Sequence, residues 1–200
     1  MNILVDLLPI TVEINNKEYE INSDFRTSIL FELLMQDDSI GDEDKILLAL
    51  QLYYPIVPTD INLAIEKMLW FYRCGKDIKK SKGNCKGKSV TQIYSFEHDD
   101  DYIYAAFMDQ YGIDLQDIEY LHWWKFKAMF NSFKEDIKIV KIMEYRSIDL
   151  SKIKDKEQKA YYKRMKNLYK LPDNISNSEK EKLKEIENAL LNGGDLSKLL

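Results

Sequence analysis

The first regular pattern along the chain is an alternation of apolar and polar residues. Residues 10–14 (ITVEI) and 18–22 (EYEIN) both alternate, as strands with one buried face do. The residues between them, 15–17 (Asn-Asn-Lys), are typical of a turn. The pattern predicts a short β-hairpin, and because an isolated hairpin is marginally stable, the hairpin is expected to pack on the rest of the protein.

From Ser23 the apolar spacing becomes helical. Ser23 and Asp24 are favourable N-cap residues, and Thr59 is expected to cap another helix that ends near Gly75. Apolar residues three and four positions apart follow each start. The helices predicted for this half of the chain cover residues 24–36, 41–53 and 59–74.

A second set of helical patterns follows a lysine-rich, weakly apolar stretch at residues 75–92, which predicts a long disordered loop. A last amphipathic segment begins at Ser176 and stops at Gly193-Gly194. The helices predicted after the loop cover residues 102–112, 120–133, 135–146 and 149–170, with a turn or short helix at 114–119.

These patterns predict a mostly α fold with an N-terminal β-hairpin and a disordered basic loop. We expect a single helical domain over residues 1–172 and a C-terminal helical tail over 173–200. The 200 residues, 45% of them hydrophobic, are enough to form a core without metals or disulfides. No apolar run approaches the length of a membrane span, and the first ten residues lack the basic start of a secretory signal, so we expect a cytoplasmic protein.

The net charge of −5 is unevenly distributed. Residues 1–72 hold 4 basic and 13 acidic residues, whereas residues 73–88 hold 7 basic and 1 acidic. Such a loop can be solvated, can contact an acidic protein surface, or can bind nucleic acid. The acidic body disfavours the last of these. The basic residues of the loop are Arg73, Lys76, Lys79, Lys80, Lys82, Lys86 and Lys88.

The cysteine, acidic and histidine residues of the chain form no pattern that predicts a catalytic or metal site. Ten residues separate Cys74 from Cys85, a spacing that matches no zinc pattern, and we expect reduced thiols. The acidic run at residues 97–101 is better explained by the positive end of a helix than by a metal ion. His122 is expected to be a packed histidine on a helix surface. No catalytic set, metal site or cofactor site is predicted.

The aromatic block at residues 120–133 (YLHWWKFKAMFNSF) has two interpretations. Most of its rings repeat at helical spacing, which is typical of a core stripe, while Trp124 and Lys127 lie off that stripe. Aromatic rings beside lysines can also bind a partner or single-stranded nucleic acid. If the block carries an interface, the expected residues are Tyr120, Trp123, Trp124 and Lys127.

Several long motifs in the chain resemble those of the bacteriophage gene product fifteen family, found in tailed phages and prophages of Gram-positive bacteria. The resemblance covers essentially residues 10–172 and brings no established catalytic residues. The motifs that carry it are E-I-N-S-D-F-R at 20–26, W-F-Y-R-C-G at 70–75, D-Y-I-Y-A-A-F at 101–107, Y-L-H-W-W-K-F at 120–126 and Y-R-S at 145–147.

The resemblance implies a non-enzymatic role in tail morphogenesis. Members of the family usually lie among tail genes, near the major tail protein and the tape-measure protein. This suggests a tail assembly chaperone that coats the tape-measure protein in the host cytoplasm and forms homo-oligomers, through Trp124 or the tail helix. The alternatives are a nucleic-acid-binding phage protein using residues 73–88 and a structural component of the tail.

Overall fold

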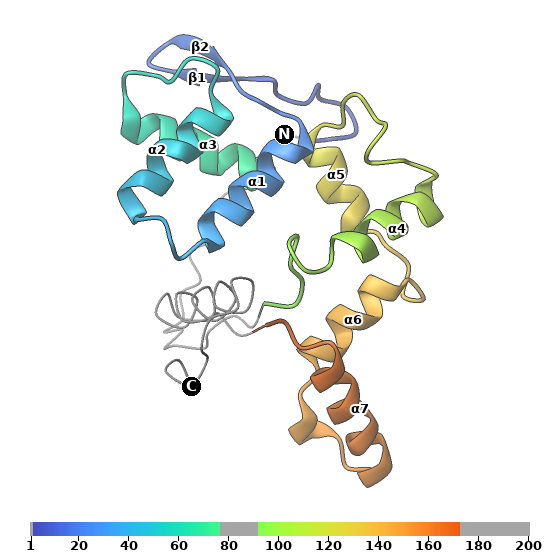
Figure 1. The fold of residues 1–200 in the computed structure, drawn as a ribbon. Helices are drawn as coiled ribbons and strands as arrows, with labels where there is room; N and C mark the ends of the chain where they lie inside the picture. The colour runs from blue at the N-terminus through green and yellow to red at the C-terminus, as the bar shows by residue number, and fades with distance from the viewer. Residues whose placement is uncertain (1, 77–91, 173–200) are drawn as a thin grey trace, which may run out of the picture. The chain divides into compact units, whose positions relative to one another are not determined.

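The computed structural model describes residues 2–76 and 92–172 of the chain (Figure 1). The chain divides into a unit of residues 1–169 and a unit of residues 170–200. Most of the predicted basic loop and the predicted C-terminal helical tail lie outside the described residues. The boundary expected at residue 172 therefore stays a prediction.

The predicted N-terminal hairpin is confirmed. Strand β1 (Thr11–Ile14) pairs antiparallel with β2 (Lys17–Glu20). The turn has two residues instead of three, because Asn15 and Asn16 both adopt left-handed backbone angles, with φ of 52° and 60°. Two successive residues of positive φ match the right-handed twist of the strands, and asparagine tolerates that conformation better than most residues. The hairpin packs against α3 (Ile61–Tyr72).

Three helices follow the hairpin, close to their predicted positions. The helix α1 (Phe25–Gln36) begins where the Asp24 carboxylate accepts a hydrogen bond from the Arg26 backbone N–H, as predicted. The helix α2 (Asp42–Tyr53) packs between α1 and α3. The expected cap of α3 was wrong by one residue, because Asp60 and not Thr59 accepts from the Leu63 N–H.

In the second half of the chain, one predicted helix is divided and another is shorter than its pattern predicts. The elements of this half are α4 (Asp100–Tyr111), α5 (Trp123–Phe130), α6 (Lys138–Ser147), the 3-10 helix η1 (Leu150–Lys152) and α7 (Lys156–Leu168). The helix expected over 149–170 is divided because Asp149 and Asp155 each accept bonds from backbone N–H groups two or three residues on, so each begins a new helix. The helix expected over 120–133 begins only at Trp123.

A core rich in aromatic side chains joins the elements before and after residues 77–91. The helix α5 packs on α1, α6 packs on α4, and α7 packs on α6. Phe25 of α1 stacks on Phe126 of α5 with ring centroids 4.9 Å apart, and Tyr72 of α3 stacks on Trp123 of α5. The described residues thus form a mostly α fold with an N-terminal hairpin. None of the helices in the described ranges is long and apolar enough to cross a bilayer.

Candidate partner-binding groove

The two tryptophans expected in an interface are buried. The exposed fractions of Trp123 and Trp124 are 0% and 4%. Their indole N–H groups donate 2.8 Å hydrogen bonds to the carbonyl oxygens of Tyr72 and Phe71, respectively. The last carbonyls of a helix lack partners within it, so the two indoles satisfy the end of α3. The expectation that Trp124 lies off the core stripe was wrong for this reason.

Tyr120 and Lys127 face different surroundings. The Tyr120 side chain is 50% exposed, and its hydroxyl is 2.7 Å from the Ser23 hydroxyl. The Lys127 ammonium donates to the Tyr94 hydroxyl at 3.1 Å and lies 3.8 Å from a Glu32 carboxylate oxygen. The four residues therefore form no shared exposed surface. Their role in binding a partner stays a prediction.

His122 is a buried N-cap and not a histidine packed on a helix surface. Its Nδ1 accepts a hydrogen bond from the Trp124 backbone N–H at 3.0 Å. Its Nε2 therefore carries the proton and donates to the Pro9 carbonyl oxygen, also at 3.0 Å. Burial lowers the pKa of His122, as does the nearby Lys125 charge, so the ring is held neutral. Sequence reasoning missed this role because helix spacing gives no reason to start the helix at residue 123.

The acidic run at residues 97–101 separates into two kinds of residue. Asp99 is buried, and its carboxylate forms a bidentate ion pair with Arg146 of α6, with N–O distances of 2.5 and 2.9 Å. Asp100 and Asp101 lie exposed in the first turn of α4, where the positive helix end favours carboxylates. Within the described ranges, no three side chains are grouped to hold a metal ion. The family motif Y-R-S at 145–147 contains Arg146, but the motif alone gave no sign of a buried pair with Asp99.

Of the seven basic residues predicted for the loop, Arg73 and Lys76 lie in the described part of the chain. Arg73 donates through Nε to the Leu69 carbonyl of its own helix, and Lys76 is exposed. Burial raises the pKa of the Cys74 thiol, so the nucleophilic thiolate is disfavoured. Cys85 and the predicted loop residues Lys79, Lys80, Lys82, Lys86 and Lys88 lie outside the described residues.

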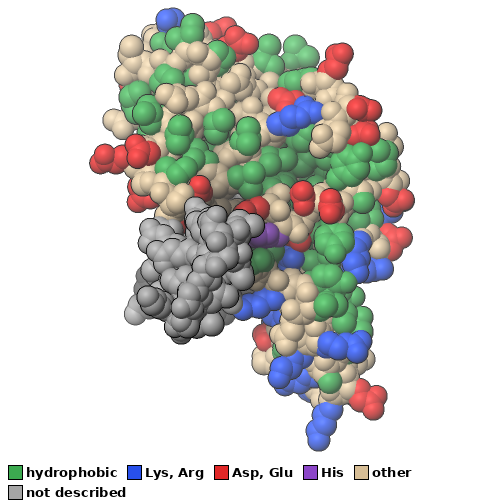
Figure 2. Space-filling model, in the orientation of Figure 1, with side chains coloured by type: hydrophobic (Ala, Val, Ile, Leu, Met, Phe, Trp, Pro, Cys, Tyr) green, Lys and Arg blue, Asp and Glu red, His purple; other side chains and the backbone are tan. Residues whose placement is uncertain are grey.

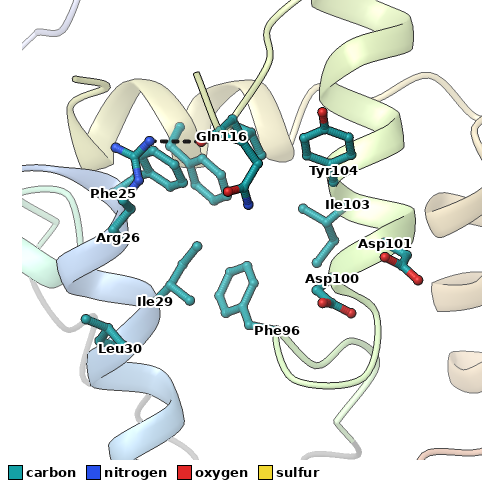
Figure 3. A pocket seen from close by; sticks show the side chains of 12 residues that line it. Phe25, Arg26, Ile29, Leu30, Phe96, Asp100, Asp101, Ile103, Tyr104 and Gln116 are labelled. Atoms are coloured by element: carbon teal, nitrogen blue, oxygen red, sulfur yellow. Dashed lines mark hydrogen bonds between the residues drawn. The ribbon is translucent and has the colours of Figure 1, made fainter. Parts of the chain in front are cut away.

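A groove with a volume of about 670 Å³ lies between α1 and α4 (Figure 3). This volume lies within the range of sites that bind organic ligands or inserted side chains. Ile29 of α1 faces Ile103 of α4 across the groove, and Leu30 lines it at the α1 edge. The remaining lining residues are Phe25, Arg26, Phe96, Asp100, Asp101, Tyr104, Leu115, Gln116 and Phe126.

Arg26 has a structural role at the edge of this groove. Its guanidinium donates to the carbonyl oxygens of Leu115 and Ile118 at 2.9 and 2.8 Å, and it pairs with Asp24 at 3.3 Å. The arginine thus fixes the segment between α4 and α5 to the start of α1. Its charge is already compensated, so it adds little to the electrostatic character of the groove.

The charge on the groove's lip comes from Asp100 and Asp101. Both carboxylates are drawn at the α4 side of the groove in Figure 3, and neither has an ion pair within the described part of the chain. An apolar floor beside two carboxylates suits an amphipathic helix that inserts large apolar side chains and carries a lysine or arginine next to them. We call this site the acid-lipped groove.

The chain is similar to one family of known proteins. The model of a family described as "Bacteriophage Gp15 protein" matches residues 4–171. Neither a curated protein nor a solved structure gives a match.

Proposed function

Because the chain belongs to the bacteriophage Gp15 family, a family of phage structural and morphogenesis proteins, we propose that it is a non-enzymatic tail assembly chaperone that binds the tape-measure protein. The match over residues 4–171 carries this proposal, since it spans every described element. The protein would act in the cytoplasm of the bacterial host, before tail subunits polymerise.

The acid-lipped groove supplies a physical means of binding. A tape-measure protein is a long helical chain, and an amphipathic helix needs an apolar surface to cover its own apolar face. Leu30, Ile29 and Tyr104 provide accessible apolar surface in the groove, above the buried side chains of its floor. Asp100 and Asp101 favour segments that carry basic residues beside the apolar ones.

Co-expression with the tape-measure protein tests the proposal. We expect the two proteins to be recovered as a soluble complex, and the tape-measure protein to be insoluble when expressed alone. Absence of any complex, with the tape-measure protein shown to be expressed, would overturn the chaperone role. Presence of the protein in purified virions at a fixed copy number would instead identify a structural component of the tail.

A pair of leucine variants tests whether the groove is the binding surface. Leu30 lines the groove and is 51% exposed, whereas Leu47 is 53% exposed on α2 and does not line it. Leu30→Arg places a bulky cation in the groove at little cost to the core, so the amount of tape-measure protein recovered should fall at least about tenfold. Leu47→Arg makes the same chemical change elsewhere and should leave recovery unchanged.

A further inference from the structure

The helix α7 exposes two large apolar side chains and one cation along one side. Tyr161, Arg164 and Leu168 are spaced at i, i+3 and i+7, so they lie along one side of the helix, with the outer two about 10.5 Å apart. Tyr161 is 45% exposed and Leu168 is 65% exposed. No ion pair of Arg164 occurs within residues 2–76 and 92–172. We call these three residues the α7 face.

The segment around α7 is strongly basic. Residues 150–170 contain 8 lysines and arginines and 2 acidic residues, whereas residues 1–72 contain 4 basic and 13 acidic residues. Figure 2 shows lysine and arginine side chains gathered over α6 and α7, and most acidic side chains over the other elements. The protein therefore carries two surfaces of opposite charge.

The α7 face has the features that the acid-lipped groove requires. The groove offers an apolar floor and two carboxylates, and the α7 face offers two large apolar side chains with a cation between them. Within one copy, α7 packs against α6 and η1, and no residue of α7 lines the groove. A match between the two surfaces thus needs two copies.

We propose that the α7 face of one copy docks in the acid-lipped groove of a second copy. Tyr161 and Leu168 enter the apolar floor, and the Arg164 guanidinium pairs with Asp100 and Asp101. The inference rests on the proposed function only in that both use the same groove. It gives that function a means of regulation, since self-association covers the groove until a tape-measure helix displaces α7.

This arrangement is head-to-tail. The donating surface and the receiving surface differ, so each dimer retains one free α7 face and one free groove. Further copies can add at both ends, and the species formed should grow with protein concentration. Salt should weaken the association, because the pairing of charges at the lip is partly exposed to solvent.

Charge reversal on each surface tests the proposal with the full chain alone. Sedimentation velocity of the wild type should give dimers and larger species that dissociate as salt is raised. The lip variant Asp100→Lys/Asp101→Lys and the face variant Arg164→Glu should each weaken self-association at least about tenfold. In a mixture, the lip variant and the face variant should associate with each other, because the new lysines of the lip can pair with the new glutamate of the face.

The matched control is Lys159→Glu, which makes the same charge change roughly 140° around α7 from Arg164 and should associate as the wild type does. A strict monomer at about 100 μM and low salt would overturn the proposal, as would association that neither reversal weakens. The recovery in the mixture distinguishes lost docking from lost folding. Because no tape-measure protein is present, these outcomes are independent of the co-expression result, and failure of the chaperone role leaves them unaffected.

Discussion

The buried His122 joins segments that are distant in the sequence. It caps α5 through Trp124, holds Pro9 before the hairpin, and lies beside Asp24 in an isolated antiparallel bridge. The Phe25 N–H donates to the Leu121 carbonyl beside it. The starts of α1 and α5 are therefore joined at one point, and a neutral imidazole is required there because Nδ1 must accept a hydrogen bond.

Acid should destabilise the protein through this residue. The pKa of His122 is lowered from its ordinary value of 6.5 by burial, so below pH 6.5 the unfolded chain binds a proton that the folded chain resists. The free energy of unfolding then falls by up to about 1.4 kcal/mol per pH unit until the folded-state pKa is reached. Chemical denaturation at pH 7 and pH 5 measures the difference.

His122→Asn should lose this part of the pH dependence, since an asparagine can still cap the helix. His98 is the other histidine and is exposed, so His98→Asn should keep the wild-type dependence. Equal pH dependence in the wild type and His122→Asn would contradict the assignment.

At the scale of elements, two arginines connect segments that are distant in the sequence. Arg26 fixes the segment before α5 to α1, and Arg146 fixes α6 to the start of α4. The Arg146 guanidinium also donates to the carbonyls of Ile93 and Tyr169 at 3.1 and 2.6 Å. The buried Arg146 side chain therefore helps to position α6 and the α7 that packs on it, beside the apolar packing of Ile139 and Ile142.

Removal of Arg146 should be strongly destabilising. Arg146→Ala leaves the Asp99 carboxylate buried without its cation, which typically costs about 3–5 kcal/mol. Lys152→Ala breaks an exposed 3.9 Å pair with Asp149 and should leave the stability almost unchanged. Urea denaturation of both variants checks this, and similar losses would show that the Arg146 pair contributes no more than a surface pair.

At the scale of the whole molecule, the elements before and after residues 77–91 share one core. The indoles of Trp123 and Trp124 satisfy α3, and Phe25 and Phe126 stack across the two parts. Neither part covers these aromatic surfaces by itself. We therefore expect each part to need the other in order to fold.

Two separate chains should consequently reassemble. Co-expression of residues 1–84 and 85–200 should give a complex that stays together in gel filtration, because the apolar surface between α1, α3 and α5 is exposed in either fragment alone. Each fragment expressed by itself should be aggregated or unfolded. Recovery of two independently folded, non-associating fragments would contradict a shared core.

Much of the architecture could be predicted from the sequence because its determinants are local. The hairpin follows from alternation around Asn15-Asn16, and α1 follows from a cap at Asp24 with apolar residues at helical spacing. The family motifs are likewise runs of adjacent residues, and the family match confirms what they imply about membership. Local hydrogen bonds and periodic burial act within one turn or one strand, so the order of residues specifies them.

The tertiary structure alone decided which side chains are functional candidates. Trp124 is buried because α3 ends against it. Asp99 is buried, unlike Asp100 and Asp101, because it pairs with Arg146, 47 residues away. The acid-lipped groove likewise joins α1 to α4, whose residues are about 75 positions apart. Such pairings depend on how helices pack, and a periodic pattern fixes which face of a helix is buried but not which partner it meets.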